Sequence, residues 1–341
     1  MEAYQTEEYR GYDINIYYDS DPESPRDWCN VATFVCEHRH YTLGDIQNIE
    51  GVIQELFDKY VSPEDIIKKF CEDYNAKLVE DDGEKCYEYK SKYDPHHSVC
   101  IPADDIDCCA EYMAEYFSER EKLDMIEATG EIVWLPISMY DHSGITIWLG
   151  GKGGHVDARW DCSTIGFAYV EKCTAEKEGA LRADKNGLYN GHKSWQEWAY
   201  DMMESEMETY NQYVTSEVFG YMVEGGDGYC DDSCWGFYGT DEIPRMIEEA
   251  KASIDYALKK QAKAHESNMA TLVQHIDKLI GETWTFGTVS YRIGTDMFGQ
   301  GCLERALVKQ SHVGHYTPCQ VNSLDFDTLD VIVKYINKTV A

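Results

Sequence analysis

Two hydrophobic patterns alternate along this chain, and together they limit its fold class. Runs such as YDINIYYD (12–19) and NVATFVCEHRHY (30–41) alternate apolar with polar residues and are rich in β-branched and aromatic side chains, which indicates strands. Stretches such as 46–60 and 62–74 instead repeat apolar residues every three or four positions, which indicates amphipathic helices. The sequence therefore predicts an α+β fold with mixed or antiparallel sheets.

Later segments continue this mixture. Residues 105–126 are predicted to form one helix, and a second helix begins at Ser194, which forms a capping-box pattern with Glu197. The segments 217–226 and 234–239 are predicted to pair as a β-hairpin, and the alternation in the second of them indicates a strand covered on both faces.

Acidic residues greatly outnumber basic ones, which restricts the possible partners. The chain has 63 Asp and Glu against 30 Lys and Arg, a formal net charge of −33. Solubility, mimicry of a polyanion, binding of divalent cations and a high-salt cytoplasm each explain such an excess. Nucleic acids and anionic membranes carry the same sign of charge, so direct binding to either is not expected. A protein with a basic surface is the expected partner.

This acidity is confined to the first part of the chain. Residues 266–341 contain eight acidic and six basic residues, so the first 265 residues hold almost all of the excess. The change in composition predicts a boundary near residue 265. We expect an acidic α+β part at 1–130, a second acidic α+β part at 131–265, and a small, near-neutral α+β module at 266–341.

The N-terminal residues and the cysteines indicate a cytoplasmic protein. The start, MEAYQTEEYRGYD, has neither a basic region nor an apolar stretch typical of a secretory signal. No run of residues is long and apolar enough to span a bilayer. Thirteen cysteines are an odd number, and without an export signal we expect them to be mostly reduced. Homo-oligomerisation is left open.

Three blocks carry a resemblance to a known family. They are DPESPR…HRHYTLGD (21–45), YDHSGIT…WDCSTIGFAYV (140–170) and DDSCWGFYG (231–239), in this order. The chain resembles a family of uncharacterised proteins of tailed phages and other mobile elements, over about residues 10–260. It departs from the family pattern at Cys162-Ser163-Thr164, where the family has Ser-Gly-Gln. The resemblance implies no activity or cofactor, but it implies expression in an infected bacterium.

A metal site is one interpretation of the first block. Cys36, His38 and His40 follow each other at every second position, so on a strand they would share one face. With Cys29 as a fourth ligand they have the chemistry of a zinc site, although the spacing matches no established zinc pattern. Histidines satisfied on a half-buried strand are the alternative.

Acid–base chemistry is a second possibility. Asp141, His142 and Asp161 lie at predicted strand ends near a glycine-rich stretch, where a histidine beside carboxylates is able to act as a general base. No phosphate loop, nucleophile elbow or dinucleotide fingerprint accompanies them. They support, at most, a metal-assisted hydrolase as an alternative function.

The helix from Ser194 carries the residues that we expect to bind a partner. Glu197, Asp201, Glu204 and Glu208 are spaced 4, 3 and 4 residues apart and so share one face. Their separation is comparable to that of phosphates along a DNA strand, within a factor of about 1.5. With the phage context, this row suggests a non-enzymatic accessory protein that binds and inhibits a host DNA-binding or defence enzyme by mimicking nucleic acid. A solvated surface without a partner, and a structural or assembly role, remain alternatives.

Overall fold

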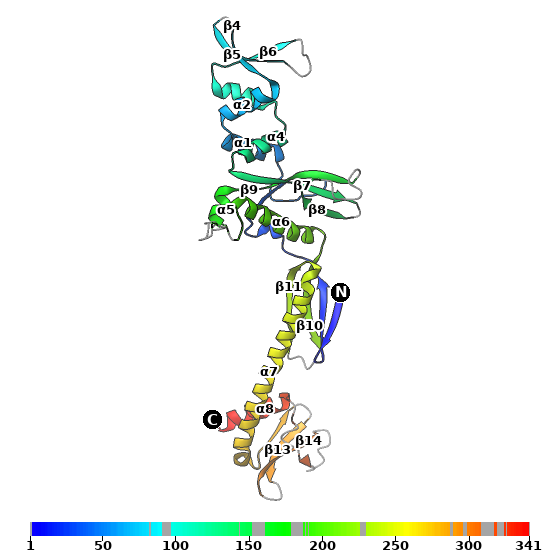
Figure 1. Cartoon of the computed structure of the whole chain (residues 1–341). Coiled ribbons are helices and arrows are strands. Elements are labelled where there is room, and N and C mark those ends of the chain that lie inside the picture. Colours follow the sequence, from blue (N-terminus) through cyan, green and yellow to red (C-terminus); the bar gives the residue numbers. More distant parts are fainter. Residues whose placement is uncertain are drawn as a thin grey trace. The chain divides into compact units, whose positions relative to one another are not determined.

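The protein has an α+β fold with antiparallel sheets, as the sequence predicts. The computed structural model describes residues 2–81, 83–90, 97–142, 144–151, 161–178, 187, 189, 191–225, 230–286, 289–295, 299–307, 317–318, 324 and 326–340. They form two compact units (Figure 1). The large unit comprises Tyr18–Phe219 and Gly236–Asp241, and the small unit comprises Met1–Tyr17, Gly220–Trp235 and Glu242–Ala341.

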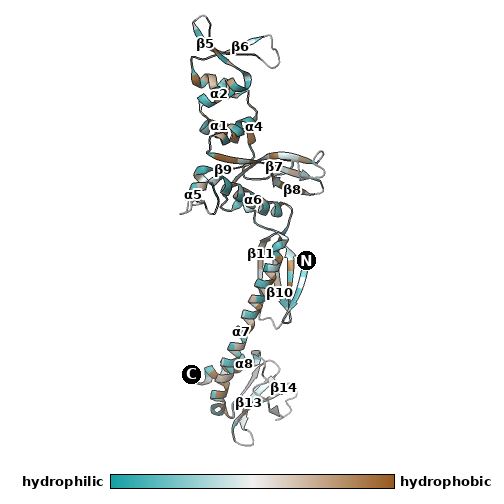
Figure 2. Ribbon diagram, in the orientation of Figure 1, coloured by the Kyte–Doolittle hydropathy of each residue, from teal (hydrophilic) through white to brown (hydrophobic). Residues whose placement is uncertain are grey.

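A four-stranded sheet forms the centre of the large unit. Its order is β3-β9-β7-β8, and the bounds are Thr33–Cys36 for β3, Ile132–Asp141 for β7, Ile145–Leu149 for β8 and Cys162–Glu171 for β9. All of its pairings are antiparallel, with an irregularity in the β7–β9 register between Ile137 and Ser138. Figure 2 shows β7 and β9 among the most hydrophobic ribbons of this unit, as expected for strands covered on both faces.

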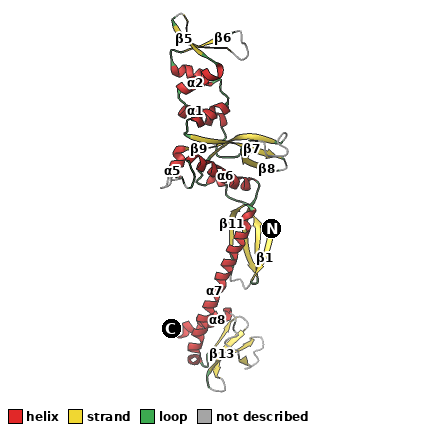
Figure 3. Cartoon of the chain, viewed as in Figure 1, coloured by secondary structure: helices red, strands yellow, loops and turns green. Residues whose placement is uncertain are grey.

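Successive residues of these strands enter two separate cores. Phe34, Val133 and Ala168 belong to one cluster, whereas Val35, Trp134 and Phe167 belong to another. This alternation follows from the two-residue period of a strand. The central sheet of the large unit therefore has helices on both of its faces (Figure 3).

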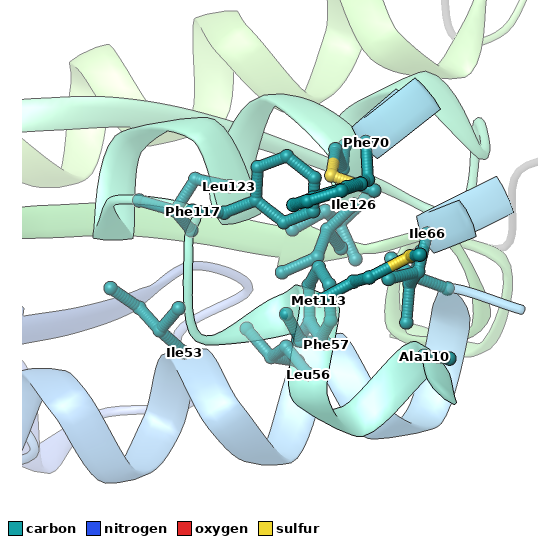
Figure 4. Packing of buried hydrophobic residues seen from close by; sticks show 14 of the residues in the cluster. Ile53, Leu56, Phe57, Ile66, Phe70, Ala110, Met113, Phe117, Leu123 and Ile126 are labelled. Atoms are coloured by element: carbon teal, nitrogen blue, oxygen red, sulfur yellow. The ribbon is translucent and has the colours of Figure 1, made fainter. Parts of the chain in front are cut away.

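Four helices and a small sheet lie on the Val35 side of the central sheet. The bounds are Ile49–Tyr60 for α1, Pro63–Tyr74 for α2, Ile106–Ala114 for α3, Glu119–Ala128 for α4, Lys77–Asp81 for β4, Glu84–Lys90 for β5 and Ser98–Pro102 for β6. Of these, α1 and α4 are in contact with the strands of the central sheet. Phe57 of α1 and Phe70 of α2 are at most 1% exposed, and burial of each contributes about 1.5–3 kcal/mol. Figure 4 shows these rings packed with Met113 and Ile126 of α3 and α4.

The single helix predicted at 105–126 is wrong, because the structure has two helices there. α3 ends before Glu115, and Ser118 begins α4 with a complete capping box to Glu121. In a continuous helix, the backbone N–H of Glu121 would bond to a carbonyl of the preceding turn. Here the side chain of Ser118 accepts from it instead, which favours the start of a new helix at Ser118.

Helix α6 (Trp195–Val214) covers the Phe34 face of the sheet, with α5 at Lys172–Glu178 and the short helix η1 at Pro25–Asp27. Its apolar face buries Trp198, Met203 and Met207. The side chain of Asn211 accepts a hydrogen bond from the backbone N–H of Ile147 on the edge strand β8, at 2.9 Å. This hydrogen bond satisfies the backbone N–H of Ile147, which has no neighbouring strand among the described residues on that side because β8 is at the edge of the sheet.

The small unit is built around a second sheet and a long helix. The sheet order is β1-β2-β10-β11, with bounds of Gln5–Tyr9 for β1, Tyr12–Tyr18 for β2, Val218–Gly225 for β10 and Ser233–Tyr238 for β11. The pairing of β10 with β11 agrees with the predicted hairpin. However, residues 233–236 are exposed and Phe237 is the buried residue of β11, so the prediction of a strand covered on both faces is wrong.

The long helix α7 (Ile243–His275) leads into a C-terminal α+β module. Its parts are η4 (Ile276–Leu279), β12 (Thr283–Phe286), β13 (Val289–Thr295), β14 (Gly301–Leu307), β15 (Thr317–Pro318) and α8 (Phe326–Val340), with sheet order β12-β13-β14-β15. Its core includes Leu272, Leu303 and Ile332, each fully buried.

The expected domain boundaries differ from the two units. Residue 265 lies inside α7, because residues 245–280 contain no glycine or proline to end the helix. Strand β3 of the first expected part pairs with β9 of the second, so residues 1–130 and 131–265 share one sheet. Among the described residues, no helix is sufficiently long and apolar to cross a membrane.

Candidate functional site

The acidic row of α6 lies on the solvent side of a firmly packed helix. Ser194 caps the helix by accepting from the backbone N–H of Glu197, and a ladder of apolar residues holds the opposite face in the core. All four carboxylates of the predicted row are exposed: Glu197, Asp201, Glu204 and Glu208. Because the backbone below them is fixed by packing, the row has a defined spacing of about 4.5–6 Å between successive positions.

Two members of this row have local partners. The Glu197 carboxylate accepts from the backbone N–H of Lys193 at 2.7 Å, and the Asp201 carboxylate lies 2.6 Å from Nε2 of His192. Glu204 and Glu208 form no hydrogen bond or ion pair with the described part of the chain. Helix α6 contains five acidic residues and no lysine or arginine. Its outer face therefore has negative charge that the helix itself does not compensate.

A cleft at one end of the central sheet contains two of the three acid–base candidates. Its volume is about 480 Å³, and it lies where β7 ends and β9 begins. Asp141 and Asp161 both line it, and the backbone N–H of Asp141 donates to the carbonyl of Asp161 at 3.0 Å. The further lining residues are Glu37, His38, Arg39, Met139, Cys162, Ser163, Thr164 and Ile165.

His142 is not part of this cleft, and His38 supplies the imidazole there. His142 is exposed, and its ring stacks on that of Tyr140 at 6.2 Å. His38 stacks on Tyr41 at 5.2 Å, and the Tyr41 hydroxyl donates to Asp141 at 3.4 Å. His38 and Asp141 are about 100 residues apart in the sequence, so their presence in one cleft cannot be predicted from spacing. It follows from the pairing of β3 with β9. The cleft thus combines carboxylates with an imidazole and a guanidinium, which suits acid–base chemistry or binding of a polar ligand.

The described residues do not support the zinc interpretation of Cys36, His38 and His40. Strand β3 ends at Cys36, so His38 and His40 lie beyond the strand and do not continue its face. Burial, followed by the charge of Asp45, raises the pKa of Cys36 to about 12, which disfavours the thiolate that zinc requires. Within the described ranges, no three His, Cys, Asp or Glu side chains are placed to hold a metal ion. The residues that line the cleft are among those described, so the cleft likewise has no set of three side chains placed to bind a metal ion.

Comparison with known proteins adds no assignment. No family model, no curated protein and no solved structure matches this chain. The function is therefore argued from the sequence and the structure alone.

Proposed function

We propose that this chain is a phage-encoded, non-enzymatic accessory protein that binds and inhibits a host protein through an acidic surface that mimics nucleic acid. The acidic row of α6 carries this proposal, because it is exposed, rigidly held and uncompensated by any base on its helix. The phage setting rests on the resemblance of the sequence blocks. The proposed target is a DNA-binding or anti-phage defence enzyme.

Electrostatics favours a basic protein as the partner. A protein that binds DNA presents lysine and arginine to phosphates spaced about 3.4 Å along each strand axis. The row on α6 offers carboxylates every 4.5–6 Å or so, and a flexible lysine or arginine side chain spans that difference. Complementary charge also raises the association rate, which suits an early inhibitor of a host enzyme.

The decisive experiment combines affinity capture with competition by DNA. The full chain is immobilised and exposed to bacterial lysate, and the retained proteins are eluted by a salt gradient or by duplex DNA. We expect a basic nucleic-acid-binding protein that DNA displaces and that leaves between about 0.2 and 0.5 M salt, because screening weakens such contacts.

Matched variants show whether α6 is responsible. Glu204→Gln with Glu208→Gln should reduce binding of the captured partner about tenfold, since each exposed charge pair contributes up to about 1 kcal/mol. Glu55→Gln with Glu64→Gln changes the net charge equally on α1 and α2 and should have little effect. A partner that is insensitive to salt and DNA, or an ordered oligomer without any host partner, would reject the proposal; the latter would favour a structural role.

The cleft favours a second candidate, a hydrolase. Its supporting observation is that Asp141, Asp161 and His38 line one cavity. Hydrolysis of phosphodiester, ester and peptide substrates by the full chain provides the test. Activity that Asp141→Asn abolishes and His142→Gln leaves intact would support this candidate, and absence of activity on all three classes would reject it.

A further inference from the structure

A second acidic feature is a groove between helices α1 to α4, away from the row on α6. Its volume is about 620 Å³. The lining residues are Gln54, Phe57, Asp58, Val61, Pro63, Ile66, Asp107, Ala110, Glu111, Ala114, Glu115 and Lys122. Figure 4 shows Phe57, Ile66 and Ala110, which come from α1, α2 and α3, packed in the core beneath it. The groove therefore has a narrow apolar floor formed by the edge of the core.

One wall of the groove is a row of carboxylates on α3. Asp107, Glu111 and Glu115 follow at intervals of four residues, so they lie on one face about 6 Å apart along the axis. All three are exposed, and none makes a side-chain hydrogen bond or ion pair with another described residue. Glu115 is also the C-cap of α3, at the negative end of the helix dipole, where an acid is unfavourable. Glu115 thus lowers the stability of the helix through the dipole, and Glu111 and Glu115 lower it further by repelling each other at four-residue spacing.

The opposite wall does not neutralise this row. Among the residues that line the groove, Lys122 supplies the cation, and its ammonium donates to the side chain of Gln54 at 2.9 Å. It also lies 5.5 Å from the centre of the Phe57 ring. Gln54 in turn donates to Asp58, a further carboxylate on the rim, at 2.7 Å. The groove consequently combines four carboxylates and one engaged lysine around an apolar floor.

We propose that this groove binds an extended basic segment of another protein, with lysine or arginine at alternate positions. In an extended chain, side chains of one face repeat about every 6.6 Å, which matches the interval of about 6 Å between carboxylates on α3. The aliphatic stems of lysine and arginine cover apolar surface while their charged ends stay at the rim, which fits this floor and wall. Charge complementarity thus selects both the composition and the spacing of the segment.

This inference does not depend on the row on α6. The helices that form the groove lie on the Val35 side of the central sheet, and α6 lies on the Phe34 side. The two acidic surfaces therefore lie on opposite sides of one sheet and do not merge into a single strip. A negative result for one surface therefore leaves the proposal for the other surface unaffected.

Fluorescence polarisation with the full chain tests the groove directly. The probe is a labelled nine-residue peptide with arginine at alternate positions and serine between, and its control has the same composition with all arginines adjacent. Glu111→Gln with Glu115→Gln should weaken binding of the alternating peptide about tenfold. Glu8→Gln with Asp13→Asn, two exposed carboxylates on β1 and β2 that belong to neither acidic surface, removes equal charge and should change the affinity less than about twofold. The alternating peptide should bind about threefold more tightly than the control.

Each other outcome overturns the proposal. Equal weakening by both variants would mean attraction to the net charge alone, and no weakening by the groove variant would mean that the peptide binds elsewhere. Spermidine that displaces the peptide and binds at least as tightly would identify a polyamine as the occupant. A dimer by sedimentation that only the groove variant dissociates would identify a second copy of the chain.

Discussion

The guanidinium of Arg26 forms a two-pronged ion pair with the carboxylate of Asp45. Nε lies 2.9 Å from Oδ1 and Nη2 lies 2.7 Å from Oδ2, while Nη1 contacts Glu206 of α6 at 2.9 Å. The Arg26 side chain is only 6% exposed and stacks 3.8 Å from the centre of the Phe34 ring. Burial acts to lower the pKa of Arg26, but the hydrogen bonds and charges of Asp45 and Glu206 outweigh it, so the pKa is raised.

This network joins the two ends of the segment 21–45. Arg26 ends DPESPR, and Asp45 ends HRHYTLGD. The Asp45 carboxylate also accepts from the backbone N–H of Phe34, at 2.7 Å, so it fixes the loop that returns beside β3. In this chain, these two residues hold the central sheet to η1 and α6 and do not line the cleft.

Removal of Arg26 is therefore expected to destabilise the large unit strongly. Arg26→Ala leaves Asp45 and Glu206 partly buried without their cation, which costs about 3 kcal/mol or more. Arg120→Ala is the matched control, because its pair with Asp124 is long, at 3.9 Å, and both side chains are more than half exposed. It should cost at most about 1 kcal/mol. Urea unfolding monitored by tryptophan fluorescence compares the two, and equal costs would contradict the structural role.

A glycine in the same loop is expected to be irreplaceable. Gly44 has φ of +69°, and an added Cβ would lie 2.6 Å from the carbonyl oxygen of Phe34. Gly44→Ala thus combines backbone strain with a clash and should cost well over about 1 kcal/mol. Gly130 has φ of +77° with open space around it, so Gly130→Ala should show the strain alone, about 1 kcal/mol. Equal midpoints of urea unfolding for the two variants would refute the clash.

Local signals in the sequence predicted part of this fold correctly. Ser194 caps α6 as predicted, because a serine before an apolar-periodic stretch satisfies a free backbone N–H group. The predicted capping box is only half formed, since the Glu197 carboxylate accepts from the backbone N–H of Lys193 and not from that of Ser194. The exposure of the row on α6 likewise follows from helical spacing. Such signals depend only on neighbours within a few residues.

Features that depend on distant residues were missed. The approach of His38 to Asp141, and the pairing of Arg26 with Asp45 and Glu206, result from the packing of the sheet against its helices. The four-residue spacing of the acidic residues on α3 can be read from the sequence. The end of the helix at Glu115 cannot, because the apolar pattern continues through 105–126 and predicts a single helix.

Acid is expected to weaken one link between α1 and the central sheet. Glu171 lies 2.5 Å from the ammonium of Lys59 and accepts from the hydroxyl of Tyr60. Burial acts to raise the pKa of Glu171, but the hydrogen bonds from Lys59 and Tyr60 outweigh it, so the pKa is lowered. A lowered pKa in the folded state stabilises the fold above the unfolded value of about 4.3, and this stability is lost as pH falls through the folded value.

Thermal unfolding of Glu171→Gln tests that link. The variant should melt below the wild-type chain at pH 7, and the gap should close as the pH falls below about 4.3. A gap that stays constant from pH 7 to the acid limit would show that the ionised form of Glu171 contributes nothing.

The buried thiol of Cys36 is expected to be inert. Its pKa of about 12 leaves it protonated at pH 8, whereas Cys29 is exposed. Brief treatment of the native chain with iodoacetamide, followed by peptide mass spectrometry, should therefore modify Cys29 and leave Cys36 unmodified until urea is added. Modification of both at the same rate, or protection of Cys36 by added zinc, would restore the zinc interpretation.

Neutralising the carboxylates of α3 is expected to stabilise the protein. Glu111→Gln with Glu115→Gln removes repulsion at four-residue spacing and an acid at the negative end of the helix dipole, together about 1 kcal/mol. The melting temperature of the large unit should rise by about 2–4 °C at low salt and by less at 1 M salt. Asp105→Ala is the control of opposite sign, because Asp105 caps the same helix by accepting from the backbone of Asp107 and Cys108. It should lower the melting temperature by a similar amount. A double variant that melts at or below the wild-type temperature would mean that these carboxylates do not oppose folding.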